Sequence, residues 1–190
     1  MTKGFKCLVI DTDIARSAGG ENTQDERSKS CRDFLLALRD TKHKIVTTET
    51  IRDEWHKHQS RFTRTWLVSM VAQKKVCWID APADGELRTK VAQAATIEKK
   101  REAMFKDIHL IEASLQADRI VISMDEIVRR CFHEISQKVR ILGKVAWVNP
   151  CKKEESPLDW LQHGAELERE RLLGYRAKAA KMQRSAQQSK

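Results

Sequence analysis

Short apolar segments recur along this chain, and longer amphipathic segments separate them. The apolar segments are 6–10, 44–47, 76–79, 119–123 and 145–148. Each has the length and composition of a buried strand, and each is too short for a helix. Buried strands that alternate with helices are typical of a parallel sheet with helices on both faces. The sequence therefore predicts an α/β fold, a three-layer α/β/α sandwich with a central parallel sheet of about five strands.

Helical periodicity predicts the elements between these strands. The expected helices are 30–39, 49–72, 85–102, 104–117 and 126–139. Thr48 suits the N-cap of the second helix, and Asp107 is expected near the start of the fourth. Of the tryptophans, Trp78, Trp147 and Trp160 are expected in the core, whereas Trp55 and Trp66 fit either the core or the surface.

A length of 190 residues favours one main domain. We assign residues 1–150 to this domain, 151–175 to a C-terminal helical extension, and 176–190 to a basic, disordered tail. Ser156 followed by Pro157 predicts a helix start in the extension, with the serine as its cap. The tail contains five basic residues and no acidic residue, and it offers few apolar anchors.

Several protein classes are excluded by simple features of the chain. The first apolar run is too short for a signal peptide and meets Asp11 at once. No run approaches the ~20 apolar residues that cross a bilayer. The five cysteines are dispersed and odd in number, which favours neither a disulfide framework nor a structural zinc site. Cys7, Cys77 and Cys131 stand among apolar neighbours and are expected in the core. We therefore expect a soluble, cytoplasmic protein without a membrane partner.

The formal net charge of +9 and the pI of about 9.4 concern partners rather than fold. Lysine and arginine bind nucleic acid through phosphate contacts and counterion release. The charge therefore favours a nucleic-acid partner, with simple solubility as the alternative.

Acidic residues follow two of the predicted strands directly. Asp11 and Asp13 follow the first strand, and Asp125 follows the fourth. In a parallel sheet, ligands bind beyond the carboxyl ends of the strands, so these carboxylates are expected to meet there. Grouped carboxylates raise one another's pKa, and a divalent cation with oxygen ligands relieves the repulsion. Glu54 and Asp107 are expected at the same edge. Each acid also has a simpler explanation as a helix cap or a surface charge.

The pattern resembles the PIN domain, a fold of metal-dependent nucleases that includes toxins of the VapC type. The stretch "LVIDTD" resembles the family's first motif, with Asp11 and Asp13. The stretch "IVTTETIRDEW" resembles the second, where Glu54 fits best and Glu49 is a substitute.

The most specific stretch of the resemblance is "KDIHLIEASLQADRIVISMDE". It contains Asp107 and then, eighteen residues later, Asp125 in a Ser-x-Asp motif that begins at Ser123. The resemblance covers residues 6–150 and implies a metal-dependent endoribonuclease that uses Mg²⁺ or Mn²⁺. It implies that Asp11, Asp107 and Asp125 are the principal metal ligands. Glu54 would support the metal or orient water, and Asp13, Ser123 and Glu126 would be auxiliary.

Further expectations concern partners of the predicted nuclease. The candidates for contacts with the RNA backbone are Arg16, Lys57, Arg61 and Arg64, each of which also fits a plain surface charge. The family resemblance adds a toxin role with an antitoxin-like partner protein. Many PIN domains dimerise, so a homodimer is a further expectation.

Two other functions fit part of the pattern. A PIN-like module that binds RNA or a partner protein without cleaving is the main alternative. A phosphatase of the haloacid dehalogenase type would use Asp11 as nucleophile and Asp13 as acid/base. That family requires Thr or Val where this chain has Ala15, and it leaves Glu54 and Asp107 without a role.

Overall fold

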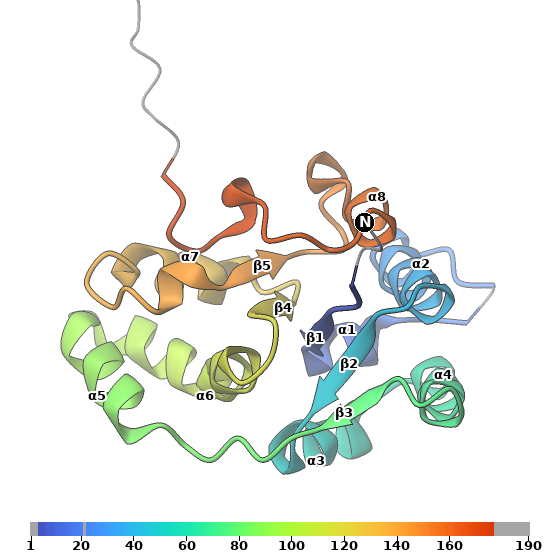
Figure 1. Ribbon diagram of the computed structural model, residues 1–190, viewed down its shortest axis with the longest axis horizontal. Helices are drawn as coiled ribbons and strands as arrows, with labels where there is room; N and C mark the ends of the chain where they lie inside the picture. Colours follow the sequence, from blue (N-terminus) through green and yellow to red (C-terminus); the bar gives the residue numbers. More distant parts are fainter. Residues whose placement is uncertain (1–3, 21, 177–190) are drawn as a thin grey trace, which may run out of the picture.

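The sheet at the centre of the molecule has five parallel strands in the order β3-β2-β1-β4-β5 (Figure 1). The structure is a computed structural model that describes residues 4–20 and 22–176. The strands are β1 (Cys7–Ile10), β2 (Lys44–Thr47), β3 (Val76–Trp78), β4 (Ile120–Ile122) and β5 (Ala146–Val148). All five strands occupy predicted segments, and four of them are one or two residues shorter than predicted.

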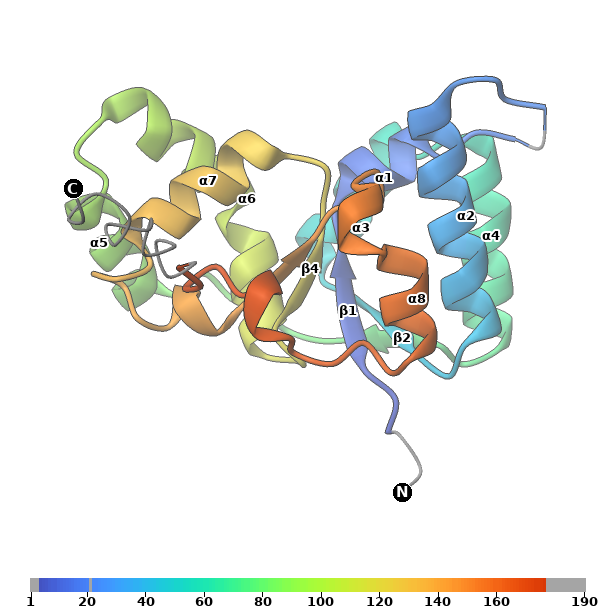
Figure 2. The same ribbon diagram turned by 90° about the horizontal axis from the view of Figure 1, so that it is seen from above.

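Eight α-helices connect and cover the strands in the described part of the chain. They are α1 (Thr12–Ser17), α2 (Glu26–Asp40), α3 (Glu49–His58), α4 (Arg61–Ala72), α5 (Gly85–Ala94), α6 (Glu98–Leu115), α7 (Glu126–Ile135) and α8 (Pro157–Gln162). Figures 1 and 2 show α5, α6 and α7 on one side of the sheet, with α2, α4 and α8 on the other. The predicted three-layer α/β/α sandwich is therefore confirmed.

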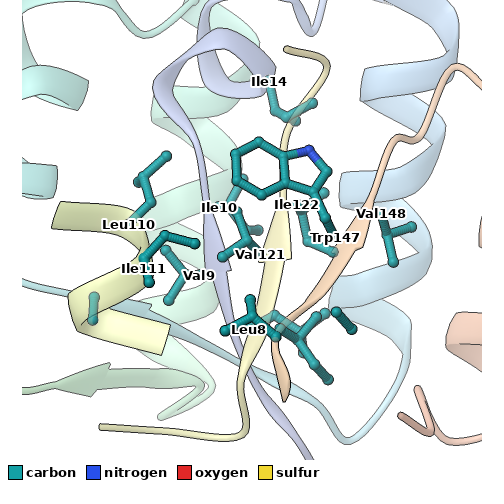
Figure 3. Close-up of a cluster of buried hydrophobic side chains, with 14 of the residues drawn as sticks. Leu8, Val9, Ile10, Ile14, Leu110, Ile111, Val121, Ile122, Trp147 and Val148 are labelled. Carbon is teal, nitrogen blue, oxygen red and sulfur yellow. The ribbon is translucent and has the colours of Figure 1, made fainter. Parts of the chain in front are cut away.

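Apolar side chains of β1, β4 and β5 pack with others from α1 and α6 in the core (Figure 3). Val9 of β1 is in register with Val46 of β2 on one side and with Val121 of β4 on the other. Val9 and Val121 are completely buried, and Trp147 of β5 is buried as well. Strands that are covered on both faces are apolar at nearly every position, which is why short continuous apolar runs in the sequence identified them.

The predicted helix over 49–72 is wrong, because the chain breaks at Gln59–Ser60 into α3 and α4. Ser60 caps α4 by accepting the Thr63 amide at 3.1 Å. The Ser60 amide donates to the Ala15 carbonyl at 2.9 Å, which holds the corner against α1. A serine with these partners satisfies backbone groups that a continuous helix would otherwise use.

The boundary between the two helices before β4 also differs from the prediction. The first helix, α5, ends at Ala94, and the second, α6, already begins at Glu98. Asp107 is therefore in the interior of α6 and not at a helix start, as had been predicted. Two helices do precede β4, as predicted, but Asp107 is too far from the N-terminus of α6 to be a helix cap.

The C-terminal extension contains less helix than predicted. The predicted helix start is confirmed, since Ser156 is the N-cap residue of α8 and Pro157 is its first residue, but Ser156 has a left-handed φ of 41° and its side chain makes no cap bond. After α8 the chain forms a short 3₁₀ turn at Arg169–Arg171 and an antiparallel bridge between Leu172 and Ala146 of β5. Two other 3₁₀ turns are η1 (Leu142–Lys144) and η2 (Lys153–Glu155). Residues 177–190 of the predicted tail lie outside the described residues.

The tryptophans divide differently from the prediction. Trp147 and Trp160 are buried as expected, whereas Trp78 of the edge strand β3 is 61% exposed. Trp55 and Trp66 are both buried, with ring centroids 6.4 Å apart. β3 has a neighbouring strand on one side only and lacks the cover that buries Trp147 in the other edge strand, β5.

Within the described ranges, every helix is too short or too polar to span a membrane.

Candidate functional site

The ends of β1 and β4, neighbours at the centre of the sheet, bring the first acidic residues together. The Asp11 amide donates to the carbonyl of Ile122, the last residue of β4, at 2.9 Å. Ser123 follows Ile122 directly and is completely buried. Asp11 and Asp125 thus begin from the same edge of the sheet, as the sequence predicted.

Asp13 joins the two turns that follow these strands. One of its oxygens, Oδ2, accepts the Met124 amide at 2.9 Å and the Ser123 hydroxyl at 3.4 Å. Its other oxygen, Oδ1, is buried and has no hydrogen-bond partner in the described chain. The Asp13 amide in turn donates to Asp11 Oδ1 at 3.2 Å, because Asp11 is the N-cap of α1. Asp13 therefore holds the acidic turns in place and keeps one free oxygen in the interior.

Asp125 is the N-cap of α7. Its Oδ1 accepts the amides of Ile127 and Val128 at 2.9 and 2.8 Å. Its own amide donates to Ser123 Oγ at 3.0 Å. These bonds fix the carboxylate at the end of β4, with Oδ2 directed to no hydrogen-bond donor in residues 4–20 and 22–176.

Asp107 approaches the same edge from α6, which packs across β1 and β4. Burial, together with the negative charges of Asp11 and Asp125, raises the pKa of Asp107 to about 7. Electrostatic coupling of this kind falls off steeply with distance. The three carboxylates thus share one electrostatic environment, although they come from three separate segments.

Glu54 of α3 forms a second part of the acidic site together with a histidine. Its Oε2 accepts the Thr12 hydroxyl at 3.1 Å and is 3.4 Å from His109 Nε2. His109 Nε2 does not meet the geometry of a hydrogen bond, so its contact with Glu54 is an ion pair. The contact with His109 lowers the pKa of Glu54 against the effect of burial. The indole of Trp55 fixes α3 here by donating to the Ile10 carbonyl at 3.3 Å.

His109 was not assigned to the site from the sequence. Burial lowers its pKa, but the negative charges of Glu54 and Asp107 outweigh burial, and the net shift is upward. Its Nδ1 contacts the Lys106 carbonyl at 3.0 Å within the same helix. The partner Glu54 belongs to a different helix, so no spacing along the chain signals the pair.

The negative charges of Asp11 and Asp13 are buried close together, and no described basic side chain neutralises them. Burial, together with the neighbouring charge of Asp11, raises the pKa of Asp13 to about 8. The pKa of Asp11 is also raised, again mainly by burial. No lysine or arginine in residues 4–20 and 22–176 forms an ion pair with either carboxylate, or with Asp107 or Asp125. Most other partly buried acids of the chain do have such a partner.

The acids match a divalent cation in donor type but not yet in arrangement. Carboxylate oxygens are the ligands that Mg²⁺ prefers, and the buried, unpartnered Oδ1 of Asp13 lies among them. Within the described ranges, however, no three Asp, Glu, His or Cys side chains are arranged to hold one metal ion. Binding would therefore require rotation of side chains toward a common point.

Glu126 differs from the other acids at this edge. Its carboxylate is 2.8 Å from Lys152 Nζ, 3.2 Å from an Arg129 guanidinium nitrogen and 3.1 Å from Asn149 Nδ2. Burial raises the pKa of Glu126, but these partners outweigh it and the net shift is downward. Glu126 thus links α7 to the turn after β5, and its contacts give no support to the predicted auxiliary role.

The four predicted contacts for the RNA backbone, which we call the basic rim, are exposed and stand near the acidic residues in the sequence. The basic rim comprises Arg16, Lys57, Arg61 and Arg64. None of the four forms an ion pair with another described residue. Arg16 is one turn after Asp13 on α1, and Lys57 is one turn after Glu54 on α3. Because Ser60 binds Ala15, the end of α3 and the start of α4 lie against α1.

Two cavities of about 480 Å³ each flank α3. One is mainly apolar and is lined by residues such as Ile51, Trp55 and Val71. The other is more polar, and its lining includes His109 and Glu112. Trp78 contributes to both linings, whereas Asp11, Asp13, Asp107 and Asp125 contribute to neither. The polar cavity reaches the acidic site through His109.

No protein-family model matches the sequence, and no curated protein matches it.

Proposed function

We propose that this protein is a metal-dependent endoribonuclease of the PIN type that hydrolyses RNA phosphodiester bonds. The observation that carries the proposal is the acidic edge of the sheet. Asp11, Asp13, Asp107 and Asp125 are partly or fully buried and electrostatically coupled, and no described basic side chain pairs with them. A divalent cation would remove the repulsion between these carboxylates.

In this proposal Asp11, Asp107 and Asp125 would hold Mg²⁺ or Mn²⁺. The metal, when bound, would polarise a phosphoryl oxygen and lower the pKa of a bound water. Asp13 keeps the two acidic turns together through the Met124 amide. His109 lowers the pKa of Glu54, which favours the carboxylate form, and this carboxylate would accept a proton from water.

The charge around the acidic site supports a nucleic-acid substrate. Arg16, Lys57, Arg61 and Arg64 have no described ion-pair partner and are available for phosphates. Cations that surround a carboxylate centre would hold the substrate backbone while the carboxylates hold the metal. A flexible single strand would adapt to such a rim more readily than a rigid duplex would.

The decisive experiment is cleavage of a labelled RNA pool with Mn²⁺, with Mg²⁺ and with EDTA. We expect cleavage with either metal and none with EDTA. Asp11→Asn should reduce the rate at least about 100-fold, since even outer-shell ligand partners are worth about 10–100-fold. Asp53→Asn is the matched control, because Asp53 is exposed on α3 and pairs only with Arg52. Equal rates in Asp11→Asn and wild type would refute the proposal.

A non-catalytic RNA-binding module is the second candidate, and one observation favours it. The acids, as they stand, include no described group of three that is arranged to hold a metal ion. Binding of RNA without cleavage under every metal condition would support this module. Release of phosphate from small phosphomonoesters would instead support the phosphatase alternative.

A toxin role, with an antitoxin-like partner, is a separate part of the proposal. If it is correct, expression of the wild-type chain should arrest growth and the Asp125→Asn chain should not. Equal growth of the two strains would contradict the toxin role without affecting the nuclease assignment. A homodimer, the other expected partner, would appear as twice the chain mass in light scattering.

A further inference from the structure

Three sulfur atoms from distant parts of the chain meet behind the acidic turn. Cys31 of α2 and Cys151 after β5 have their sulfurs 4.0 Å apart. Each is 3.4 Å from the Met124 sulfur. Met124 is the residue between Ser123 and Asp125, and its amide binds Asp13. The sulfur cluster, which we define as Cys31, Met124 and Cys151, is therefore attached to the acidic site by the main chain.

The two thiols of the sulfur cluster have opposite environments. Cys31 is completely buried, and contact with Cys151 together with burial raises the pKa of the Cys31 thiol. Cys151 is partly exposed, and contact with Cys31 and the positive charge of Arg27 lower its pKa to about 7. The guanidinium Nε of Arg27 is 3.2 Å from the Met124 sulfur. A reactive thiol with access to solvent thus contacts a buried thiol that can resolve it.

A second pair of cysteines, Cys7 and Cys77, has sulfurs that are close together but main chains that are too far apart for a disulfide. The sulfurs of Cys7 and Cys77 are 3.2 Å apart, but these residues belong to β1 and β3, with β2 between them. Their main chains are held roughly two strand spacings apart, whereas a disulfide needs a Cα separation of ~4.4–6.8 Å. Burial raises the pKa of Cys7 to about 12, which disfavours a thiolate. This pair provides an internal control.

We propose that Cys151 and Cys31 form a peroxide-sensitive modification site, in which Cys151 is oxidised first and a disulfide with Cys31 follows. None of the five cysteines is in a disulfide in the structure, so both thiols of the pair are available to react. Cys151 is in a surface turn rather than a helix or strand, so the main chain at one end of the bond can move. Closure requires the sulfurs to approach from 4.0 Å to about 2.05 Å.

The chemistry balances with a peroxide as the oxidant. The Cys151 thiolate attacks one peroxide oxygen, the O–O bond breaks, and the second oxygen leaves as hydroxide. Cys151 becomes a sulfenic acid, and the peroxide is reduced. The Cys31 sulfur then attacks the Cys151 sulfur, the S–O bond breaks, and hydroxide leaves and takes up the proton of the Cys31 thiol. Two thiols and hydrogen peroxide thus yield one disulfide and two waters. A dithiol reductant reduces the disulfide and restores both thiols.

Closure of the disulfide would be transmitted to the acidic site. The Cys151 amide donates to Asn149 Oδ1 at 2.9 Å, and Asn149 Nδ2 reaches the Met124 carbonyl at 3.5 Å. Met124 contacts both thiols and holds Asp13 through its amide. An effect of oxidation on RNA cleavage rests on the proposed function, whereas formation of the disulfide does not.

The first test measures thiol reactivity in the wild-type protein, without any variant. At pH 7 a thiol with a pKa of about 7 is half ionised, whereas an ordinary thiol with a pKa of ~8.5 is ionised to a few per cent. Cys151 should therefore be alkylated by limiting iodoacetamide about 15-fold faster than an ordinary thiol. Peptide mass spectrometry assigns the rates. A rate for Cys151 no higher than that for buried Cys131 would overturn the proposal.

The second test follows oxidation of the full chain by hydrogen peroxide. Mass spectrometry should find a linked 31–151 peptide pair and a chain lighter by two hydrogens, with Cys7 and Cys77 still free. Cys31→Ser should stop at a sulfenic acid on Cys151 that dimedone traps, and Cys151→Ser should protect Cys31. Cys77→Ser is the matched control and should still form the bond. A disulfide of any other pairing, or none, would refute the site.

A final arm separates this proposal from the nuclease assignment. RNA cleavage is measured before oxidation, after oxidation and after reduction with dithiothreitol. If no state cleaves RNA but the 31–151 bond forms, the proposed function fails and the modification site stands. If RNA is cleaved but no such bond forms, the modification site fails and the nuclease stands.

Discussion

The side chain of Asp13 accepts the backbone amide of Met124 at 2.9 Å and so joins the turn after β1 to the turn after β4. The second oxygen of this carboxylate is buried without a partner in the described chain. A buried anion in this position is costly, because no described basic side chain pairs with it. The metal-free protein therefore stores unfavourable electrostatic energy at the acidic edge.

Without metal, stability should fall as the pH rises from about 4 to about 8, between the unfolded and the folded pKa values of the two groups. Asp13 and Asp107 have folded pKa values of about 8 and about 7, well above those of the unfolded chain. In this window the folded state binds more protons than the unfolded state, so each pH unit costs up to ~1.4 kcal/mol per titrating group. Urea unfolding in EDTA measures the slope. Asp13→Asn should flatten it, Asp53→Asn should not, and a slope of the opposite sign would contradict the electrostatic argument.

Binding of a divalent cation should release protons. At pH 7 Asp13 and Asp107 are partly protonated, and a metal binds the ionised form. Titration calorimetry with Mn²⁺ in buffers of different ionisation enthalpy should give different heats. The unfolding free energy should rise by about 2.7 kcal/mol when free Mn²⁺ is 100 times its dissociation constant. Heats that do not depend on the buffer would contradict metal binding at this acidic edge.

Replacement of His109 should shift the acidic limb of the pH–rate profile. The contact with His109 lowers the pKa of Glu54, so His109→Ala should raise that pKa and move the limb to higher pH. The matched control is His56→Ala, because His56 is on the same helix as Glu54 and makes no ion pair with another described residue. Identical profiles for His109→Ala and wild type would exclude a role for the pair in proton transfer.

The basic rim should act through charge alone. In a protein disabled by Asp11→Asn, Arg16→Ala and Lys57→Ala should each weaken binding of single-stranded RNA. They should also reduce the dependence of log affinity on log salt by about 0.7 per lost phosphate contact. Fluorescence anisotropy in EDTA at several salt concentrations measures both. Lys138→Ala, which changes an exposed lysine after α7, is the control and should leave the slope unchanged. Equal slopes in all variants would assign the rim to plain solubility.

The sheet could be predicted from the sequence because its strands are buried on both faces. Runs such as Cys7–Ile10 and Ile120–Ile122 are apolar at almost every position, and that property is local. The break at Ser60 was missed because the apolar spacing continues across it, while its cause is a bond to Ala15 in a distant helix. Trp78 was misplaced because an edge strand and a central strand have similar composition.

The acidic site could be predicted in part for the same reason. Asp11 and Asp125 follow parallel strands, so topology alone brings them to one edge. The pairing of Glu54 with His109 depends on how α3 and α6 pack, which no single segment specifies. The sulfur cluster was equally invisible, since Cys31 and Cys151 come from opposite ends of the chain.

The position of Trp78 gives this protein a built-in optical probe. The ring is 61% exposed and borders both cavities beside α3, whereas Trp55, Trp66, Trp147 and Trp160 are at most 4% exposed. Iodide in solution should therefore quench the emission of one indole out of five. A molecule that occupies either cavity would shield the Trp78 indole from iodide, so binding can be followed by tryptophan fluorescence without a label.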